Sequence, residues 1–409
     1  MNEVATSETF RKYIFFWIGQ LFSLLGSSIV QFVIIWWITN ETESPIYVSI
    51  AAFLSFLPMV IISPLAGVYV DRWNRKLIIA ISDSFQALTT FFIIILFITN
   101  ITNVWIVIIL NSLRGLCQAF HFPTVNAIIP IMVPKKYLSR INGINYFFTG
   151  IVQIFGPIIS AFLFAIWPIQ LILWSDIITF FIAITALLLI KIPSILEKNK
   201  IQASFKEDFR IGIEVLKNVP GLIILLVLVS AVNFLSAPFN TLMPLFVKVE
   251  HFGTAADLAI VMALIQVGMI SGAFIASIKK NWRNKVKVIM LGIIIAVLGR
   301  IIATLSPQGF IFLIGIGGLI RSAMIPIINT NYLTIIQTNV KPETQGRVLS
   351  IVMAIATAVT PIAMIISGPL AEIMGIIPLF LFFAFLEFLS VVVTWLFTNI
   401  KHVSYEKTV

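Results

Sequence analysis

The sequence predicts an all-α integral membrane protein with twelve transmembrane helices in two pseudo-symmetric six-helix bundles. Its 409 residues are 59% hydrophobic and 11% charged, and the mean hydropathy is +1.06. No soluble domain of this size has such a composition. Long apolar runs follow one another, each of the roughly 20 residues that cross a hydrocarbon core about 30 Å thick. The cations between these runs alternate from loop to loop.

Twelve apolar runs are long enough to be membrane spans. Their expected bounds are 14–39, 47–70, 77–99, 104–132, 142–166, 168–190, 220–247, 256–278, 286–305, 309–338, 347–370 and 377–398. The first run follows a polar N-terminal segment, and it is too long for a cleaved signal peptide, so it counts as a span. The chain is therefore expected to be bound to the lipid bilayer throughout.

Lysine and arginine gather in every second loop. Segment 71–76 and the loop with Lys135, Lys136 and Arg140 are basic, whereas segment 40–46 has no cation. Because the positive-inside rule places basic loops in the cytoplasm, both termini are expected there, in a bacterial cell membrane. The net charge of +10 therefore reflects topology, and no nucleic-acid partner is expected.

The longest loop divides the chain into two halves of six spans each. Apolar residues recur in it at helical spacing, which predicts an amphipathic helix at the cytoplasmic surface: Phe205, Phe209, Ile213 and Leu216. The expected organisation is an N-terminal bundle, a linker with this helix and a C-terminal bundle, at residues 1–191, 192–219 and 220–409.

The two halves read as parallel repeats. In each, an arginine of the fourth span is followed by a proline, a second arginine and then a Gly-Pro pair in the fifth span. These positions are Arg114, Pro134, Arg140 and Gly156-Pro157 in the first half, and Arg321, Pro342, Arg347 and Gly368-Pro369 in the second.

Polar residues stand inside four spans, the first, fourth, seventh and tenth. The candidates for a substrate cavity are Gln20, Gln31, Arg114, Gln118, His121, Asn233, Asn240, Arg321 and Asn329. Helices with such stripes face either a water-filled cavity or one another. The alternative interpretation is that these side chains are hydrogen-bonding contacts between packed helices, and for His121 a packing role.

Three acidic residues also lie inside spans: Asp83, Asp176 and Glu387. A charge in hydrocarbon costs about 2.5–3.5 kcal/mol, so each needs a reason. One reason is proton exchange, which a proton-coupled antiporter requires. The alternative is structural: Asp83 is close to the cytoplasmic end of its span, where it could form a gate salt bridge with Arg75 or Arg114.

Segment 67–76 has the pattern Gly-x-x-x-Asp-Arg-x-x-Arg-Lys. This spacing resembles the signature between spans 2 and 3 of the major facilitator superfamily, although a topogenic basic loop is the simpler alternative. The resemblance implies a cytoplasmic gate in which Asp71 and Arg75 tie the two halves together when the cavity opens outward. It also implies that spans 1, 4, 7 and 10 line that cavity. The residues of the expected gate are Gly67, Asp71, Arg72, Arg75 and Lys76.

Two further resemblances concern drug exporters. Gly150, Gly156 and Pro157 partly match the antiporter motif of their fifth span. Segments 119–127, 238–245 and 251–252 resemble bacterial macrolide efflux proteins. This resemblance implies export of a bulky amphipathic compound.

The sequence thus predicts a secondary active transporter that exports a bulky amphipathic, drug-like or macrolide-like compound by proton antiport and alternating access. An exporter of a siderophore or lipid-like metabolite on the same fold is the alternative, and a membrane-embedded enzyme or sensor is remote. One cysteine, three histidines and scattered acids show no catalytic or metal-ligand spacing. The expected partners are a small-molecule substrate and protons, with no enzyme activity, cofactor or metal, and the chain is expected to be a monomer.

Overall fold

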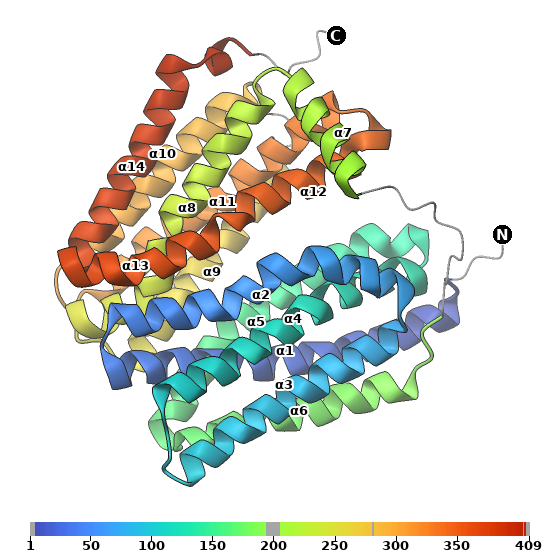
Figure 1. Cartoon of the computed structure of the whole chain (residues 1–409), viewed down its shortest axis with the longest axis vertical. Coiled ribbons are helices and arrows are strands. Elements are labelled where there is room, and N and C mark those ends of the chain that lie inside the picture. The colour runs from blue at the N-terminus through green and yellow to red at the C-terminus, as the bar shows by residue number, and fades with distance from the viewer. Residues whose placement is uncertain (1–4, 194–204, 280–281, 404, 406–409) are drawn as a thin grey trace. The chain divides into compact units, whose positions relative to one another are not determined.

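The computed structural model describes residues 5–193, 205–279, 282–403 and 405, and of residues 64, 65, 67–69, 71, 72, 205–209 and 343 only the backbone. Within that part of the chain, twelve helices are long and apolar enough to cross a membrane. The prediction of an all-helical protein with twelve spans is therefore confirmed (Figure 1).

The first six spans begin and end close to their expected bounds. They are α1 (Ser7–Thr42), α2 (Pro45–Arg72), α3 (Arg75–Ile98), α4 (Val104–Met132), α5 (Leu138–Ile166) after the short η1 (Lys135–Tyr137), and α6 (Ile169–Leu189). Thr6, Asn74 and Asn103 accept backbone hydrogen bonds at the starts of α1, α3 and α4. These N-caps satisfy amides that the helix leaves unpaired, which is why the helices begin there.

The second half begins with the amphipathic helix. Its elements are α7 (Phe205–Asn218), α8 (Leu222–Leu245), η2 (Phe246–Glu250), α9 (Ala255–Ile278), α10 (Lys285–Thr304), α11 (Ile311–Asn339), α12 (Pro342–Ala358), α13 (Thr360–Met374), α14 (Ile376–Phe397) and η3 (Asn399–His402). Asn284 caps α10 by accepting from the amide of Lys287 at 3.0 Å. Asn74 caps α3 in the same way, so the helix starts match between the repeats.

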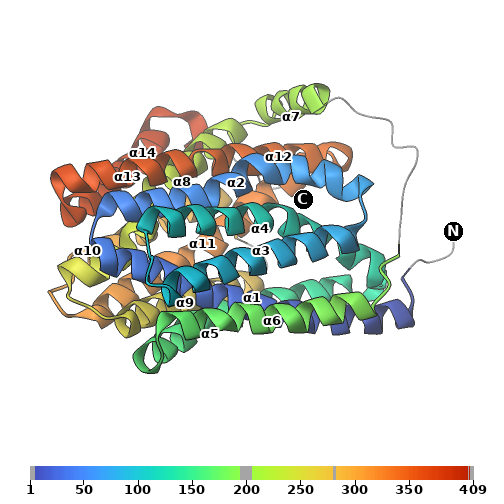
Figure 2. The ribbon, with the colours of Figure 1, turned by 60° about the horizontal axis from the view of Figure 1, so that its bottom comes forward.

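The eleventh span is interrupted, whereas the sequence predicts one continuous run. α12 ends at Ala358 and α13 begins at Thr360, and Figure 2 shows the two helices following one another along one line. Pro361 stands in the first turn of α13, and proline removes a helix hydrogen bond and clashes with the preceding turn. Asn233 of α8 donates to the carbonyl of Ala356 at 2.8 Å, next to the interruption.

The chain divides into two compact units. Unit 1 comprises residues 1–43 and 50–199, and unit 2 comprises residues 44–49 and 200–409. The amphipathic helix α7 belongs to unit 2 and lies beside α12 (Figure 1). Leu216 is buried there, and Gly212 lies against Ile351. The side chains of Phe205 and Phe209 lie outside the described residues.

Small residues let the helices of unit 1 approach closely. α1 packs against α4, α5 and α6. A Cβ atom on Gly26 would lie 2.0 Å from Oγ1 of Thr179 on α6, and one on Gly156 of α5 would lie 2.2 Å from Oγ of Ser28. Glycines at such crossings bring backbones together, as small residues do between membrane helices.

We expect Gly156→Ala to lower the apparent melting temperature of the purified protein, since overpacking costs about 1–3 kcal/mol. The added Cβ would also lie 2.8 Å from Cβ of Ser28, which side-chain rotation cannot move. Gly143→Ala on the same helix is the matched control, because a Cβ there meets nothing within 4 Å. Equal melting temperatures for the two variants would contradict the tight α1–α5 crossing.

Candidate functional site

A buried ion pair joins the fourth and sixth spans of unit 1. Arg114 of α4 is 4% exposed and Asp176 of α6 is 3% exposed, and Nη1 of Arg114 lies 2.6 Å from Oδ2 of Asp176. Thr90 of α3 donates to the same carboxylate oxygen at 2.6 Å and accepts from Arg114. Ser27 of α1 donates to Oδ1 of Asp176 at 3.0 Å. Four helices therefore meet at one carboxylate.

This network extends through two glutamines. Nε2 of Gln86 on α3 donates to Oγ of Ser27 at 2.6 Å. Nε2 of Gln118 on α4 donates to Oε1 of Gln86 at 2.7 Å. The polar stripe of α4 thus points at α1, α3 and α6 within unit 1. Asn111, on the same helix, instead donates to Oγ of Ser55 on α2 at 2.8 Å.

A second cluster in unit 1 contains Asp83, His121 and Gln20. Nε2 of His121 lies 3.2 Å from Oδ1 of Asp83 and 2.9 Å from Oε1 of Gln20. Nε2 of Gln20 donates to Oδ2 of Asp83 at 3.3 Å. Nε2 of His121 thus faces two side-chain oxygens, one from α3 and one from α1.

The structure corrects the expected partners of Asp83. The sequence analysis considered a gate salt bridge with Arg75 or Arg114, but Asp83 pairs with His121, and Arg114 pairs with Asp176. The reason is the level of Asp83 along α3. Thr90 and Gln86 of the same buried face contact Arg114 and Gln118 of α4, so Asp83, nearer the start of α3, lies level with His121. His121, for which a packing role was the alternative, contacts Gln20 and Asp83, and its part in a cavity stays a prediction.

Unit 2 also contains a buried ion pair, and the sequence analysis did not single out its arginine. Arg300 of α10 and Glu387 of α14 are each 1% exposed and are joined through Nη2 and Oε2. Nη1 of Arg300 donates to the carbonyl of Leu235 at 3.0 Å, and Nη2 donates to Oγ of Ser236 at 2.9 Å. An arginine inside an otherwise apolar run was the signal that could have identified it.

The remaining candidates of unit 2 are only partly brought together. Arg321 of α11 is 6% exposed, and its Nη1 donates to Oδ1 of Asn240 at 3.2 Å. Its Cζ lies 5.3 Å from the ring centroid of Phe239. Asn329 is exposed on α11, and Asn233 bonds the Ala356 carbonyl. In unit 1, Gln31 is half-buried on α1.

The expected gate segment is described only in part. Gly67, Asp71 and Arg72 lie in α2, and their side-chain surroundings are outside the described residues, so the gate role stays a prediction. Nζ of Lys76 donates to the carbonyls of Leu188 and Ile190, at 2.8 and 2.7 Å. A cation at the C-terminal carbonyls of a helix is stabilising, so Lys76 fixes the end of α6. Arg75 is half-buried.

The segment that resembles the antiporter motif lies on α5. Gly156 and Pro157 are buried and Gly150 is half-buried. Ser160 donates to the carbonyl of Gly156 at 2.6 Å and to the carbonyl of Ile29 on α1 at 3.3 Å. The motif therefore forms part of the α1–α5 crossing.

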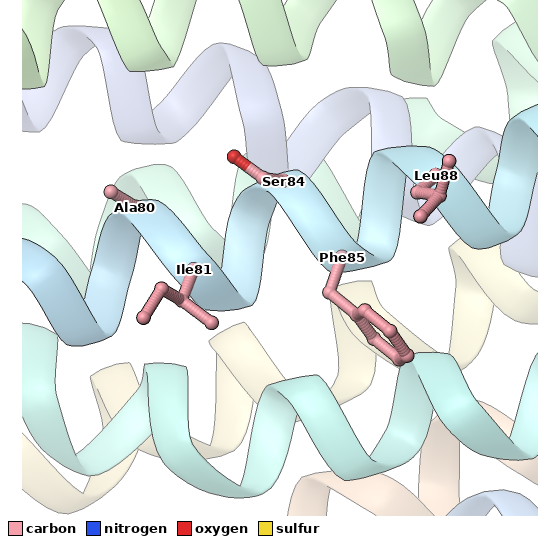
Figure 3. Close-up of a pocket in the computed structure, with 5 residues that line it drawn as sticks. All are labelled: Ala80, Ile81, Ser84, Phe85 and Leu88. Carbon is pink, nitrogen blue, oxygen red and sulfur yellow. The ribbon is translucent and has the colours of Figure 1, made fainter.

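A shallow hollow of about 340 Å³ runs along α3. Figure 3 shows its lining side chains, all from that helix: Ala80, Ile81, Ser84, Phe85 and Leu88. None of them belongs to the clusters above, because the acidic and amide residues of α3 occupy another face. Within the described ranges, no three His, Cys, Asp or Glu side chains gather into a group that could hold a metal ion.

We expect Asp176→Asn to destabilise the protein strongly, because it leaves the Arg114 guanidinium buried without its counter-ion. Removing one partner of a buried pair costs about 3–5 kcal/mol. The double variant Arg114→Gln/Asp176→Asn should lose less than the sum of the two single variants. Melting temperatures of the four proteins in detergent form the double-mutant cycle, and additive losses would show that the two side chains do not act as a pair.

Comparisons with known proteins show which family this chain resembles. Residues 16–352 match the Major Facilitator Superfamily. Macrolide efflux protein A of Streptococcus pyogenes is 29% identical over 89% of this chain and 90% of its own length. The staphyloferrin A transporter of Staphylococcus aureus is 24% identical over 90% of this chain and 91% of its own.

A solved structure shows the same fold. The crystal structure of nucleoside transporter NupG superposes with a TM-score of 0.69 at 15% sequence identity, over 98% of this chain and 100% of that one. The family match covers most of the chain, and the likeness to the solved transporter extends over nearly all of it. This chain is therefore a multi-pass membrane transporter of the Major Facilitator Superfamily.

Proposed function

We propose that this transporter exports a bulky amphipathic compound across a bacterial cell membrane by alternating access, in exchange for protons. The similarity to macrolide efflux protein A supports the substrate class and the direction. The observation that carries the coupling is the contact of Asp83 with His121 and Gln20 inside unit 1. Both bundles enter from the same side, both termini are cytoplasmic, and the transporter works as a monomer.

A proton carrier has to be stable both with and without its proton. Arginine keeps its proton in proteins, so the Arg114–Asp176 and Arg300–Glu387 pairs are neutral only while their acids are ionised. Protonating either acid would leave a buried cation without a counter-ion. Among the described residues, Asp83 is the buried acid of the spans whose partners include no arginine, because it lies against His121 and Gln20. We therefore assign the proton exchange to Asp83.

Asp83 and His121 are connected to the helices around them. Asp83 lies three residues before Gln86 on α3, and Gln118 lies three residues before His121 on α4. Residues three apart lie on the same helix face, so Asp83 neighbours Gln86 and His121 neighbours Gln118. A change of charge at Asp83 or His121 therefore alters the electrostatic environment of the Gln86–Gln118 hydrogen bond. From there it reaches the carboxylate that holds α1, α3, α4 and α6 together.

The alternative substrate is a siderophore or lipid-like metabolite. One relative is named a staphyloferrin A transporter. The observation that favours this alternative is the buried Arg321, whose described partners include no carboxylate.

We expect Asp83→Asn and His121→Gln to abolish uptake of a radiolabelled macrolide into everted vesicles under an imposed pH gradient. Exchange of labelled for unlabelled compound without a gradient should persist, because it needs binding and alternating access but no net proton movement. Ser84→Ala, an exposed change on the same helix, is the matched control. Wild-type uptake that survives collapse of the gradient, or gradient-driven uptake by Asp83→Asn at the wild-type rate, would rule out this coupling.

We propose the gate role of Asp71 from the resemblance of segment 67–76. Asp71→Asn should stop transport while leaving the melting temperature unchanged, because the side chain would act on a change of state and not on packing. Transport and melting temperature are measured on the same preparation. Normal turnover in the variant would remove Asp71 from the gate.

A further inference from the structure

The buried charges of unit 2 do not balance. Its described spans bury two arginines, Arg300 and Arg321, and one acid, Glu387. Glu387 is taken by Arg300, which also uses the Leu235 carbonyl and the Ser236 hydroxyl. Among the described residues, no carboxylate lies within ion-pair distance of Arg321. An ionisable side chain inside a membrane span is expected to have a counter-charge, and the described residues supply none within ion-pair distance of Arg321.

The surroundings of Arg321 leave most of its hydrogen-bonding capacity unused by the described residues. Arginine has five N–H donors in a planar fork, and the acceptor found here is the amide oxygen of Asn240 at 3.2 Å. The ring of Phe239 supports the guanidinium by a cation–π contact at 5.3 Å. Arg321 is 6% exposed, and its partner Asn240 is exposed, so a ligand would reach the guanidinium beside Asn240.

The repeat shows how the imbalance arises. Arg114 and Arg321 stand at equivalent positions of α4 and α11. Each lies the same number of residues before the C-cap of its helix, which is Val133 in α4 and Val340 in α11. Arg114, however, has Asp176 at 2.6 Å. Thr90 and Arg300 are equivalent in the same sense, because each lies the same number of residues after the N-cap of its helix, α3 or α10. Unit 2 therefore has an arginine where unit 1 has a threonine, and that arginine takes the carboxylate.

We propose that Arg321, with Asn240 and Phe239, forms an anion-binding subsite that takes a carboxylate, sulfonate or phosphate group of an amphipathic ligand. A planar guanidinium binds such groups through two parallel hydrogen bonds. Phe239 is 1% exposed, so its ring positions the guanidinium and does not itself contact the ligand. The inference rests on the proposed transport of amphipathic compounds. It adds that the compounds bound at this subsite carry an acidic group.

The test compares two dyes that differ by one charged group. Anilinonaphthalene sulfonate is an anionic amphipath, and phenylnaphthylamine is the same aromatic skeleton without the sulfonate. Saturable binding of each is measured by fluorescence on the purified full chain in phosphatidylcholine nanodiscs, with empty discs subtracted. We expect Arg321→Gln to weaken binding of the sulfonate by about tenfold or more, the size of a lost charged hydrogen bond. Binding of phenylnaphthylamine should not change.

Arg283→Gln is the matched control, because it removes the same charge from an exposed position before α10 and should leave both affinities unchanged. Where Arg321→Gln does not fold, Arg321→Lys decides, since it keeps the charge but loses the planar fork. We expect this variant to bind the sulfonate more weakly than the wild type. Sulfonate affinity equal to the wild type in the folded Arg321 variants would overturn the subsite.

Discs that contain phosphatidylglycerol distinguish a lipid headgroup from a free ligand. If an anionic lipid fills the subsite, sulfonate affinity in these discs falls further for the wild type than for Arg321→Gln. Equal falls identify the free amphipath as the occupant. One outcome would retain the proposed function and reject this inference. It is proton-driven efflux of neutral or cationic compounds together with a sulfonate affinity that the Arg321 substitutions leave unchanged.

Discussion

The structure depends on how a carboxylate is kept inside an apolar helical unit. Asp176 is almost fully buried and is satisfied by Arg114, Thr90 and Ser27. These partners come from three different helices. A buried charge without partners costs several kcal/mol, so each helix has to keep the rotation that presents its partner. The ion pair therefore fixes the orientation of α1, α3, α4 and α6 more narrowly than apolar packing would, because lipid-like side chains pack in many ways.

The two units solve this problem with the same elements and reach different charge states. In unit 1 a threonine, Thr90, completes the Arg114–Asp176 pair. In unit 2 an arginine, Arg300, stands at the matching position of the repeat and takes Glu387. In unit 1 the Arg114–Asp176 pair is balanced, and Asp83 lies against His121. Unit 2 is left with a buried positive charge. The two units therefore differ in the residue type at one position, Thr90 on α3 and Arg300 on α10.

Close packing and polar contacts operate on the same helices. Gly26 and Gly156 let α6 and α5 approach α1, and this proximity brings Ser27 to the carboxylate of Asp176. Lys76 fixes the end of α6 through two carbonyls. These contacts therefore join α1, α3, α5 and α6 to one another.

The sequence by itself determined the number of spans and the identity of nearly all buried charges. These features depend on local properties: the length of an apolar run, the cost of a charge in hydrocarbon and the side on which cations gather. Only the tertiary structure decided which charges meet. Asp83 pairs with His121, Arg114 with Asp176, and Arg300 with Glu387. Each partner lies on another helix, and helical periodicity says which residues share a face but not which neighbour that face meets.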